Sequence, residues 1–382
     1  MTDKGISSVT GIAEMGLPQI IMIIISILLA YLAIGKKYEP LLLLPLAFGM
    51  LIANIPVAGL SAHFEGGLVY YLYKGIEYGI YPPLIFLCIG AMTDFGPLIA
   101  SPKSALIGLG GQLGIFVAMG GAIFIGQFVA PGVPGLEPFT IQDAAAIGII
   151  GSSDGPTSLY TAIRLAPDLL PTIAIAAYSY MALVPLIQPP IMRVLTTPKE
   201  RVIEMPPAHG ISRRARIIFP VAVTLGTLIL VPAAGALISM LMLGNLIKES
   251  GVADRIVRSL QNDVLNVLTL LIGLSVGATA TADRILDLRT IIIICLGLIA
   301  FCFGTAGGVL IAKLLCKITG GKVNPLIGNA GVSAMPMAAR VSQKLGQEYN
   351  PQNHLLMHAM GPIVSSTIGS ALIAGLFISF FS

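Results

Sequence analysis

Asp154 has the setting in this sequence that most clearly suggests chemistry. It lies in a stretch of glycines, hydroxyl side chains and a proline that spans residues 148–158. Pro156 cannot continue an undisturbed helix, and the neighbouring glycines allow the backbone to turn sharply. The freed carbonyls and the hydroxyls are hard oxygen donors around one carboxylate, which suits a small hard cation such as Na⁺. A polar loop outside the bilayer and an ordinary helix N-cap are the alternative interpretations.

A second broken segment, residues 324–336, also combines glycine, proline and polar side chains. Two segments of this kind at corresponding places in two halves of a chain indicate the ion site of a transporter. We therefore predict a Na⁺ site that is split between the two segments. Its predicted ligands are Asp154, Asn324, Gly328 and Ser333.

Two further residues could take part in the chemistry. Arg340 could neutralise Asp154, bind a carboxylated substrate through its planar guanidinium, or simply anchor a helix end at the membrane surface. Tyr180, within a later apolar run, could donate a proton, although most such tyrosines are packing residues.

The composition indicates a polytopic membrane protein. Of the 382 residues, 55% are hydrophobic and only 10% are charged. The net charge of +4 reflects basic loops and does not indicate nucleic-acid binding. The four cysteines lack metal-ligand spacing, and the sequence contains no P-loop or zinc motif.

We expect an all-α fold of about ten transmembrane helices with two re-entrant hairpins, near residues 139–165 and 323–342. Irregular backbone at membrane depth survives only where it is buried in protein or lines a wet cavity, which favours hairpins here. The predicted spans are residues 18–34, 40–60, 79–98, 103–129, 169–191, 214–232, 234–248, 262–280, 289–313 and 355–381.

A faint internal repeat predicts inverted-topology halves. Residues 90–94 are similar to residues 277–283, and the two broken segments then correspond to each other. Lys and Arg in short loops place the basic loop 192–216 in the cytoplasm and both termini outside. The predicted division is an N-terminal segment with the first helix (1–39), a first repeat (40–191), a basic loop with a linking helix (192–233) and a second repeat (234–382).

The two broken segments strongly resemble signatures of a known family. The sequences Gly-Ile-Ile-Gly-Ser-Ser-Asp-Gly-Pro-Thr, from Gly148, and Asn-Pro-Leu-Ile-Gly-Asn-Ala-Gly-Val-Ser-Ala-Met-Pro-Met-Ala-Ala-Arg, from Asn324, are similar to those of the β subunits of biotin-dependent, sodium-translocating decarboxylases. The resemblance covers the chain from about residue 18 to its end. One departure is Ile363, where many members of that family have Asn.

The resemblance implies a subunit that releases CO₂ from carboxybiotin and exports Na⁺ with consumption of a proton. It implies that Asp154 is the essential intramembrane aspartate, that Tyr180 handles the proton, and that Asn324, Gly328, Ser333 and Arg340 are polar residues of the second signature. Arg340 is a candidate for binding carboxybiotin.

The implied cofactors are Na⁺ and biotin, and the chain has no Met-Lys-Met acceptor for biotin. The implied partners are a biotin carrier subunit, a carboxyltransferase α subunit and a small membrane-anchored γ/δ subunit, in a bacterial or archaeal cytoplasmic membrane. We also expect a homo-oligomer of β subunits. The residues alone leave a second function open, a Na⁺- or H⁺-coupled carboxylate transporter that cleaves no bond.

Overall fold

The computed structural model describes residues 14–37, 39–206 and 210–382, so residues 1–13 and 38 of the predicted segment 1–39 lie outside the described part. All regular structure in the described part is helical. The first half contains α1 (Leu17–Gly35), α2 (Pro40–Ala53), α3 (Leu68–Glu77), α4 (Tyr81–Met92), α5 (Gly96–Ala100), α6 (Ala105–Gly111), α7 (Leu113–Phe124), α8 (Ile141–Ile150), α9 (Gly155–Leu165) and α10 (Leu170–Leu195). The second half contains α11 (Pro198–Arg201), α12 (Arg213–Leu230), α13 (Gly235–Ser250), α14 (Asp254–Ser259), α15 (Leu265–Gly277), α16 (Ala282–Ile285), α17 (Leu288–Ile318), the 3₁₀ segment η8 (Pro325–Gly331), α18 (Met337–Tyr349) and α19 (Leu356–Phe381).

The described helices include five that are long and apolar enough to cross a membrane, or up to seven if each bent helix pair counts as one span. One such pair is α3 with α4, which meet at 71°. Leu17, Ile229 and Phe380 are exposed apolar side chains on outer helices, as expected of surfaces in contact with lipid. The fold class is therefore an all-α, multi-pass membrane protein, while the predicted count of ten spans stays a prediction.

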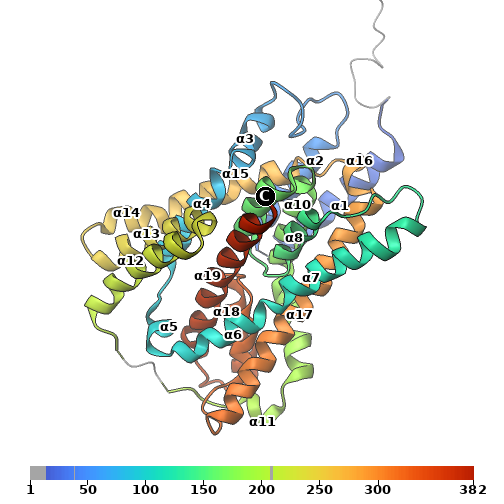
Figure 1. Cartoon of the computed structure of the whole chain (residues 1–382). Helices are drawn as coiled ribbons and strands as arrows, with labels where there is room; N and C mark the ends of the chain where they lie inside the picture. Colours follow the sequence, from blue (N-terminus) through green and yellow to red (C-terminus); the bar gives the residue numbers. More distant parts are fainter. Residues whose placement is uncertain (1–13, 38, 207–209) are drawn as a thin grey trace, which may run out of the picture.

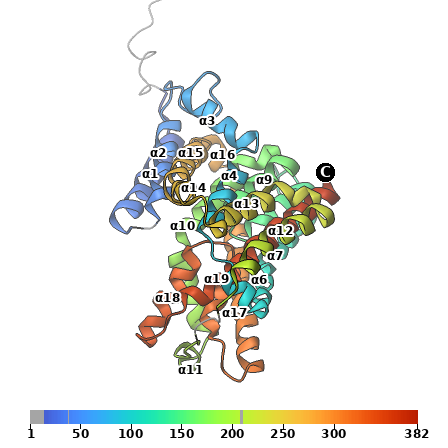
Figure 2. The same cartoon turned by 90° about the vertical axis from the view of Figure 1, so that its left-hand side faces the viewer.

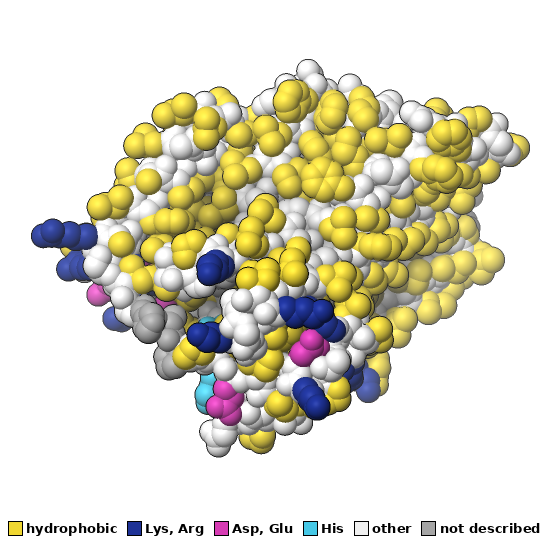
Figure 3. Space-filling view, turned by 60° about the horizontal axis from the view of Figure 1, so that its bottom comes forward, with side chains coloured by type: hydrophobic (Ala, Val, Ile, Leu, Met, Phe, Trp, Pro, Cys, Tyr) yellow, Lys and Arg dark blue, Asp and Glu magenta, His cyan; other side chains and the backbone are white. Residues whose placement is uncertain are grey.

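Charged and apolar surfaces are separated in space. Figure 3 brings the lower end of Figure 1 forward and shows Lys and Arg side chains gathered there, with hydrophobic side chains over most of the remaining face. The short helix α11, which belongs to the basic loop 192–216, lies at this end in both ribbon views (Figures 1 and 2). This distribution agrees with a basic face of the molecule on one side of a membrane.

The helix pairs α2 with α15 and α4 with α13 make the same kind of close contact, in which a glycine of each helix lies against a carbonyl oxygen of the other. A Cβ atom on Gly49 of α2 would lie 2.3 Å from the Leu274 carbonyl oxygen of α15, and one on Gly277 of α15 would lie 2.1 Å from the Leu46 oxygen of α2. Glycine is needed at these positions because the helix backbones themselves are in contact.

The same geometry recurs between α4 and α13. A Cβ on Gly90 would lie 1.9 Å from the Leu241 oxygen, and one on Gly244 would lie 2.0 Å from the Leu87 oxygen. In all four contacts the carbonyl lies three residues before the partner glycine. If the chain has two halves related by a two-fold axis, α2 of the first half corresponds to α13 of the second, and α4 corresponds to α15. The reciprocal contacts fit this arrangement, which supports the predicted match of Gly90 with Gly277.

The two broken segments pack in a matching way. Gly151, at the end of α8, lies against Gly114 of α7, and Gly328 of η8 lies against Gly308 of α17. Both contacts are close enough that a Cβ would overlap backbone atoms of the neighbouring helix. The glycine-rich run 108–114 supplies part of this support, with Gly111 against Gly331 and Gly114 against Gly151.

Some predicted boundaries are wrong. The predicted span 40–60 ends as a helix at Ala53, because the Asn54 side chain donates hydrogen bonds to the carbonyl oxygens of Met50 and Ala280 and the chain then turns. The predicted span 79–98 is helical only over α4 before a break. The predicted hairpin 323–342 ends inside α18, which continues to Tyr349 along an amphipathic stretch.

Candidate functional site

The first hairpin places Asp154 at the start of a buried helix. Helix α8 ends at Ile150, four residues turn, and α9 begins at Gly155 with Asp154 as its N-cap. One Asp154 oxygen, Oδ1, accepts a hydrogen bond of 3.2 Å from the Thr157 backbone N–H. Asp154 is only 4% exposed, so it does not lie on an exposed loop. The N-cap interpretation is correct but leaves the second oxygen to be explained.

That second oxygen joins the hairpin to the last helix. Ser370 of α19 donates a hydrogen bond of 2.7 Å to Asp154 Oδ2. Ser370 Oγ also lies 3.4 Å from Ser333 Oγ of the second broken segment, and Ser333 Oγ lies 2.9 Å from Ser366 Oγ. The hairpins also touch directly, because the Ser333 N–H donates to the Ser152 carbonyl at 2.9 Å. The structure thus brings Asp154 and Ser333 into one buried cluster.

Several buried oxygen atoms around this cluster have no hydrogen-bond partner in the described part of the chain. They are Ser153 Oγ, Thr157 Oγ1, Tyr178 Oη and Gln112 Oε1. Buried polar atoms are normally paired, so a group of them near one carboxylate suggests a ligand. The donor set of one carboxylate and neutral oxygens fits Na⁺, and the described residues contain no cluster of three His, Cys, Asp or Glu side chains that would suit a transition metal.

Asn324 and Gly328 do not join this cluster. The Asn324 amide donates to the Arg201 and Ile203 carbonyls, at 3.1 and 2.8 Å, and its oxygen accepts from the Leu326 N–H at 2.9 Å. These bonds begin η8 and hold the loop after α11. Gly328 contacts α17, where a Cβ would lie 2.4 Å from the Val309 Cα. Both residues therefore shape the second hairpin, and neither has a contact with Asp154.

Tyr180 also lies elsewhere. Its hydroxyl donates to the Ile294 carbonyl of α17, and its ring packs against Gly297. Residues two apart on a helix point to nearly opposite sides, so Tyr178 faces the first hairpin instead. A Cβ on Gly155 would lie 2.9 Å from Cζ of Tyr178. The tyrosine beside the Asp154 hairpin is therefore Tyr178, and the predicted proton-handling role of Tyr180 stays a prediction.

Arg340 is exposed and lines a cavity of about 470 Å³ at the basic end of the molecule, together with Lys37, Arg193 and Lys344. No ion pair joins Arg340 to Asp154 within the described residues, so the predicted neutralisation of Asp154 receives no support. Glu39 also lines this cavity. Burial raises the pKa of the Glu39 carboxyl, and the nearby positive charge of Arg340 opposes this shift.

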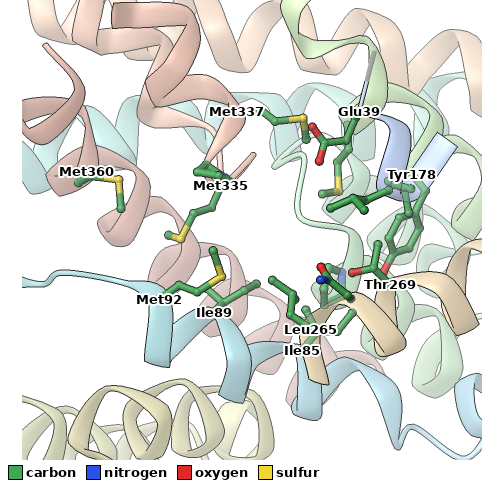
Figure 4. Close-up of a pocket in the computed structure, with 16 residues that line it drawn as sticks. Glu39, Ile85, Ile89, Met92, Tyr178, Leu265, Thr269, Met335, Met337 and Met360 are labelled. Atoms are coloured by element: carbon green, nitrogen blue, oxygen red, sulfur yellow. The ribbon is translucent and has the colours of Figure 1, made fainter. Parts of the chain in front are cut away.

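An inner cavity of about 180 Å³ shares two lining residues with this mouth and is lined in part by the Asp154 hairpin. Glu39 and Met337 line both cavities, and Pro156 and Tyr178 line the inner one. Figure 4 shows Glu39 and Met337 next to each other on one side of the cavity, with Tyr178 and Thr269 together on another. The sequence did not single out Glu39, Ser366, Ser370, Tyr178 or Gln112. The one available signal was the pair Ser366 and Ser370, hydroxyls one helical turn apart in an apolar run.

Comparison with known proteins identifies the family. The family model of the Na⁺-transporting oxaloacetate decarboxylase beta subunit matches residues 18–381. The chain is 53% identical to the methylmalonyl-CoA decarboxylase subunit beta of Veillonella parvula, over 95% of this chain and 93% of the relative. It is 51% identical to the glutaconyl-CoA decarboxylase subunit beta of Acidaminococcus fermentans, over 93% and 91%, and 46% identical to the oxaloacetate decarboxylase beta chain of Klebsiella pneumoniae, over 97% and 96%.

These matches cover nearly the whole chain, and they confirm the resemblance seen in the two signatures. They do not favour the alternative of a carboxylate transporter that cleaves no bond. A beta subunit functions with partner subunits, and its family name implies that Na⁺ is transported. The chain belongs to the family of Na⁺-transporting decarboxylase beta subunits, and it is the multi-pass membrane subunit of a decarboxylase sodium pump.

Proposed function

We propose that this subunit removes the carboxyl group from carboxybiotin and couples the release of CO₂ to Na⁺ export, with consumption of a proton. The observation that carries this proposal is the hydrogen-bond chain from Asp154 of the first hairpin through Ser370 to Ser333 of the second. One carboxylate shared by two hairpins gives a single ion site, and movement of the hairpins relative to the surrounding helices can change the side from which that site is open.

In this proposal Asp154 is the charged Na⁺ ligand, and Ser333, Ser370 and Thr157 supply neutral oxygens. The Thr157 and Tyr178 hydroxyls, which have no hydrogen-bond partner among the described residues, support this assignment. Asp154 binds a proton when Na⁺ leaves, because a buried carboxylate without a cation is costly in free energy. We assign the proton-transferring hydroxyl, predicted as Tyr180, to Tyr178, which is the tyrosine next to the Asp154 hairpin. Asn324 and Gly328 keep the second hairpin in shape.

Arg340 is proposed to receive the carboxylate of carboxybiotin at the cytoplasmic mouth. Its exposure, and the positive charges of Lys37 and Lys344 in the same cavity, support this role. A guanidinium offers two parallel N–H donors that match the two oxygens of a carboxylate.

Biotin comes from partners in this proposal. A carboxyltransferase α subunit carboxylates the biotin of a carrier subunit, a small γ/δ subunit anchors the complex, and several β subunits associate in the cytoplasmic membrane of a bacterium or archaeon. The named relatives act in decarboxylases of three different acids. We infer that the acid is selected by the carboxyltransferase, and that this chain uses the same carboxybiotin step for each.

We also propose the division predicted from the sequence, with two inverted repeats over residues 40–191 and 234–382. The reciprocal contacts of α2 with α15 and of α4 with α13 support it. Moving one Na⁺ outward against about 100 mV costs roughly 2.3 kcal/mol. Efficient coupling therefore requires that carboxybiotin is cleaved only when Na⁺ occupies the site between the hairpins.

The test is purification of the native complex, followed by decarboxylation assays with oxaloacetate, methylmalonyl-CoA, glutaconyl-CoA and malonate, with and without Na⁺. We expect Na⁺-dependent CO₂ release from one of these acids, sensitivity to avidin, and ²²Na⁺ uptake by inverted vesicles. Decarboxylation that is independent of both biotin and Na⁺ would overturn the proposal.

A further inference from the structure

The inner cavity lies between the two hairpins and the neighbouring helices α2, α4 and α15. Pro156 comes from the first hairpin, Met335 and Met337 come from the second, and Leu42 and Leu265 come from the helices opposite. With about 180 Å³, it is much smaller than the usual 300–1,000 Å³ of pockets that enclose a whole small ligand. It can hold a compact ring system, and it is too small for an acyl-CoA.

The lining is apolar, with a few polar groups at defined places. Methionines from several elements, among them Met92 of α4 and Met360 of α19, face it (Figure 4). Methionine side chains are flexible and polarizable, so they adapt their shape to an apolar ligand. Asn266 and Thr269, three residues apart on one face of α15, line the cavity. Their side chains form no hydrogen bond with the described protein, so their polar atoms remain available to a ligand.

We propose that this cavity binds the bicyclic head group of carboxybiotin, with Asn266 and Thr269 bound to its ureido group, and that the carboxyl group is cleaved there. This inference rests on the proposed function and extends it. An amide and a hydroxyl can each donate and accept hydrogen bonds, which matches the carbonyl and N–H of the ureido ring. The apolar thioether ring of biotin faces the methionines. The head group enters through the Arg340 mouth, past Glu39, which lines both cavities.

The cavity favours the reaction by excluding water. In the reaction the bond between the carboxyl carbon and the ureido nitrogen breaks, and its electron pair stays on the nitrogen. That nitrogen takes the one proton that is consumed, relayed by the Tyr178 hydroxyl in the cavity wall, while CO₂ leaves. The substrate carries a concentrated negative charge on the carboxylate, whereas CO₂ is neutral. In apolar surroundings without a guanidinium, the concentrated charge of the substrate costs more free energy than the dispersed charge of the transition state. The barrier to cleavage is therefore lower in the cavity than in water.

The location also links cleavage to the ion. Pro156 and Tyr178 form the wall of the cavity next to Asp154, and Met335 and Pro336 directly follow the Ser333 segment. A head group in the cavity thus contacts both hairpins at once. A shift of the hairpins upon Na⁺ binding alters the shape of the cavity in which cleavage takes place.

The first test is cysteine protection in the assembled complex, in a background without the native cysteines. Thr269→Cys reports on the inner cavity, Glu348→Cys on the mouth, and Glu65→Cys on a separate cavity lined by Asp168 and Arg284. We expect the biotinylated carrier to slow maleimide labelling of Thr269→Cys severalfold and the unbiotinylated carrier to leave it unchanged. Both carriers slow labelling of Glu348→Cys, and neither affects Glu65→Cys. Equal labelling of Thr269→Cys with both carriers overturns the inference.

The second test keeps the native cysteines and measures cleavage directly. Leu265→Asn adds a polar group to the cavity wall, and Leu270→Asn makes the same change on the exposed side of α15. In single-turnover assays with pre-carboxylated carrier at saturation, we expect Leu265→Asn to slow CO₂ release by about tenfold or more, since about 1.4 kcal/mol of desolvation is lost. We expect Leu270→Asn to change the rate by less than about twofold.

An unchanged rate in Leu265→Asn, or equal slowing in both variants, overturns the inference while the decarboxylase function stands. If the unaltered complex releases no CO₂ from carboxylated carrier, the proposed function itself fails. The two failures are therefore distinguishable in the same assay.

Discussion

Replacement of Asp154 by Asn removes one charge and almost nothing else. The amide oxygen of Asn can still accept from the Thr157 N–H, and its NH₂ group can donate to Ser370, whose hydroxyl can turn to accept. Both the N-cap and the link to α19 are then retained. Asp154→Asn is therefore expected to insert and assemble like the unaltered subunit.

The negative charge of Asp154 strengthens Na⁺ binding by a large factor. Two unit charges about 4 Å apart attract by about 4 kcal/mol at an effective dielectric constant of about 20. Since about 1.4 kcal/mol corresponds to a tenfold change in binding, the loss of charge weakens Na⁺ binding by roughly three orders of magnitude. Turnover is expected to collapse at any practical Na⁺ concentration.

The assay combines Na⁺-dependent CO₂ release by the purified complex with ²²Na⁺ transport in vesicles, and gel filtration checks assembly. Asp154→Glu serves as the charge-retaining comparison. It is also expected to be poor, because the extra methylene moves the carboxylate within a buried turn where Asp154 is 4% exposed. If Asp154→Asn decarboxylates and pumps at the unaltered rate, the assignment of the ion site is wrong.

Three further predictions concern the neutral ligands, the Arg340 mouth and the helix contacts. Ser333→Ala and Ser370→Ala each remove a neutral oxygen worth about 1–3 kcal/mol, so the Na⁺ concentration for half-maximal decarboxylation is expected to rise roughly ten- to a hundredfold; unchanged Na⁺ dependence in both would remove these serines from the site. Arg340→Gln is expected to raise the KM for the biotinylated carrier by about tenfold, because one charge-assisted hydrogen bond is lost. The Na⁺ dependence is expected to stay the same, and a change in the Na⁺ dependence alone would contradict the assigned role. Gly90→Ala places a Cβ 1.9 Å from a carbonyl oxygen of α13, whereas Gly120 has nothing within 4 Å; thermal unfolding in detergent is expected to show a loss of about 1–3 kcal/mol for the first and little change for Gly120→Ala.

The sequence by itself was sufficient to predict a multi-pass helical membrane protein and to locate the two segments where its helices are interrupted. Long apolar runs with few charges require helices across a membrane, because a backbone in lipid must satisfy its own hydrogen bonds. Pro156 and the glycines around Asp154 interrupt such a run for local steric reasons, which need no tertiary contact. The similarity of residues 90–94 to residues 277–283 was also visible in the sequence, and both Gly90 and Gly277 lie in helix contacts too close for a larger side chain.

The tertiary structure decided which residues surround Asp154. Ser370 is 216 residues away along the chain and reaches Asp154 only because α19 crosses the first hairpin. Tyr178 and Tyr180 lie two residues apart in the same apolar run, and the rotation of α10 determines that Tyr178 faces Gly155 while Tyr180 faces α17. Asn324 has the chemistry of a ligand, but its amide is occupied by the Arg201 and Ile203 carbonyls. Residue type and local spacing limit what a side chain can do, whereas the packing of distant helices determines which partners it meets.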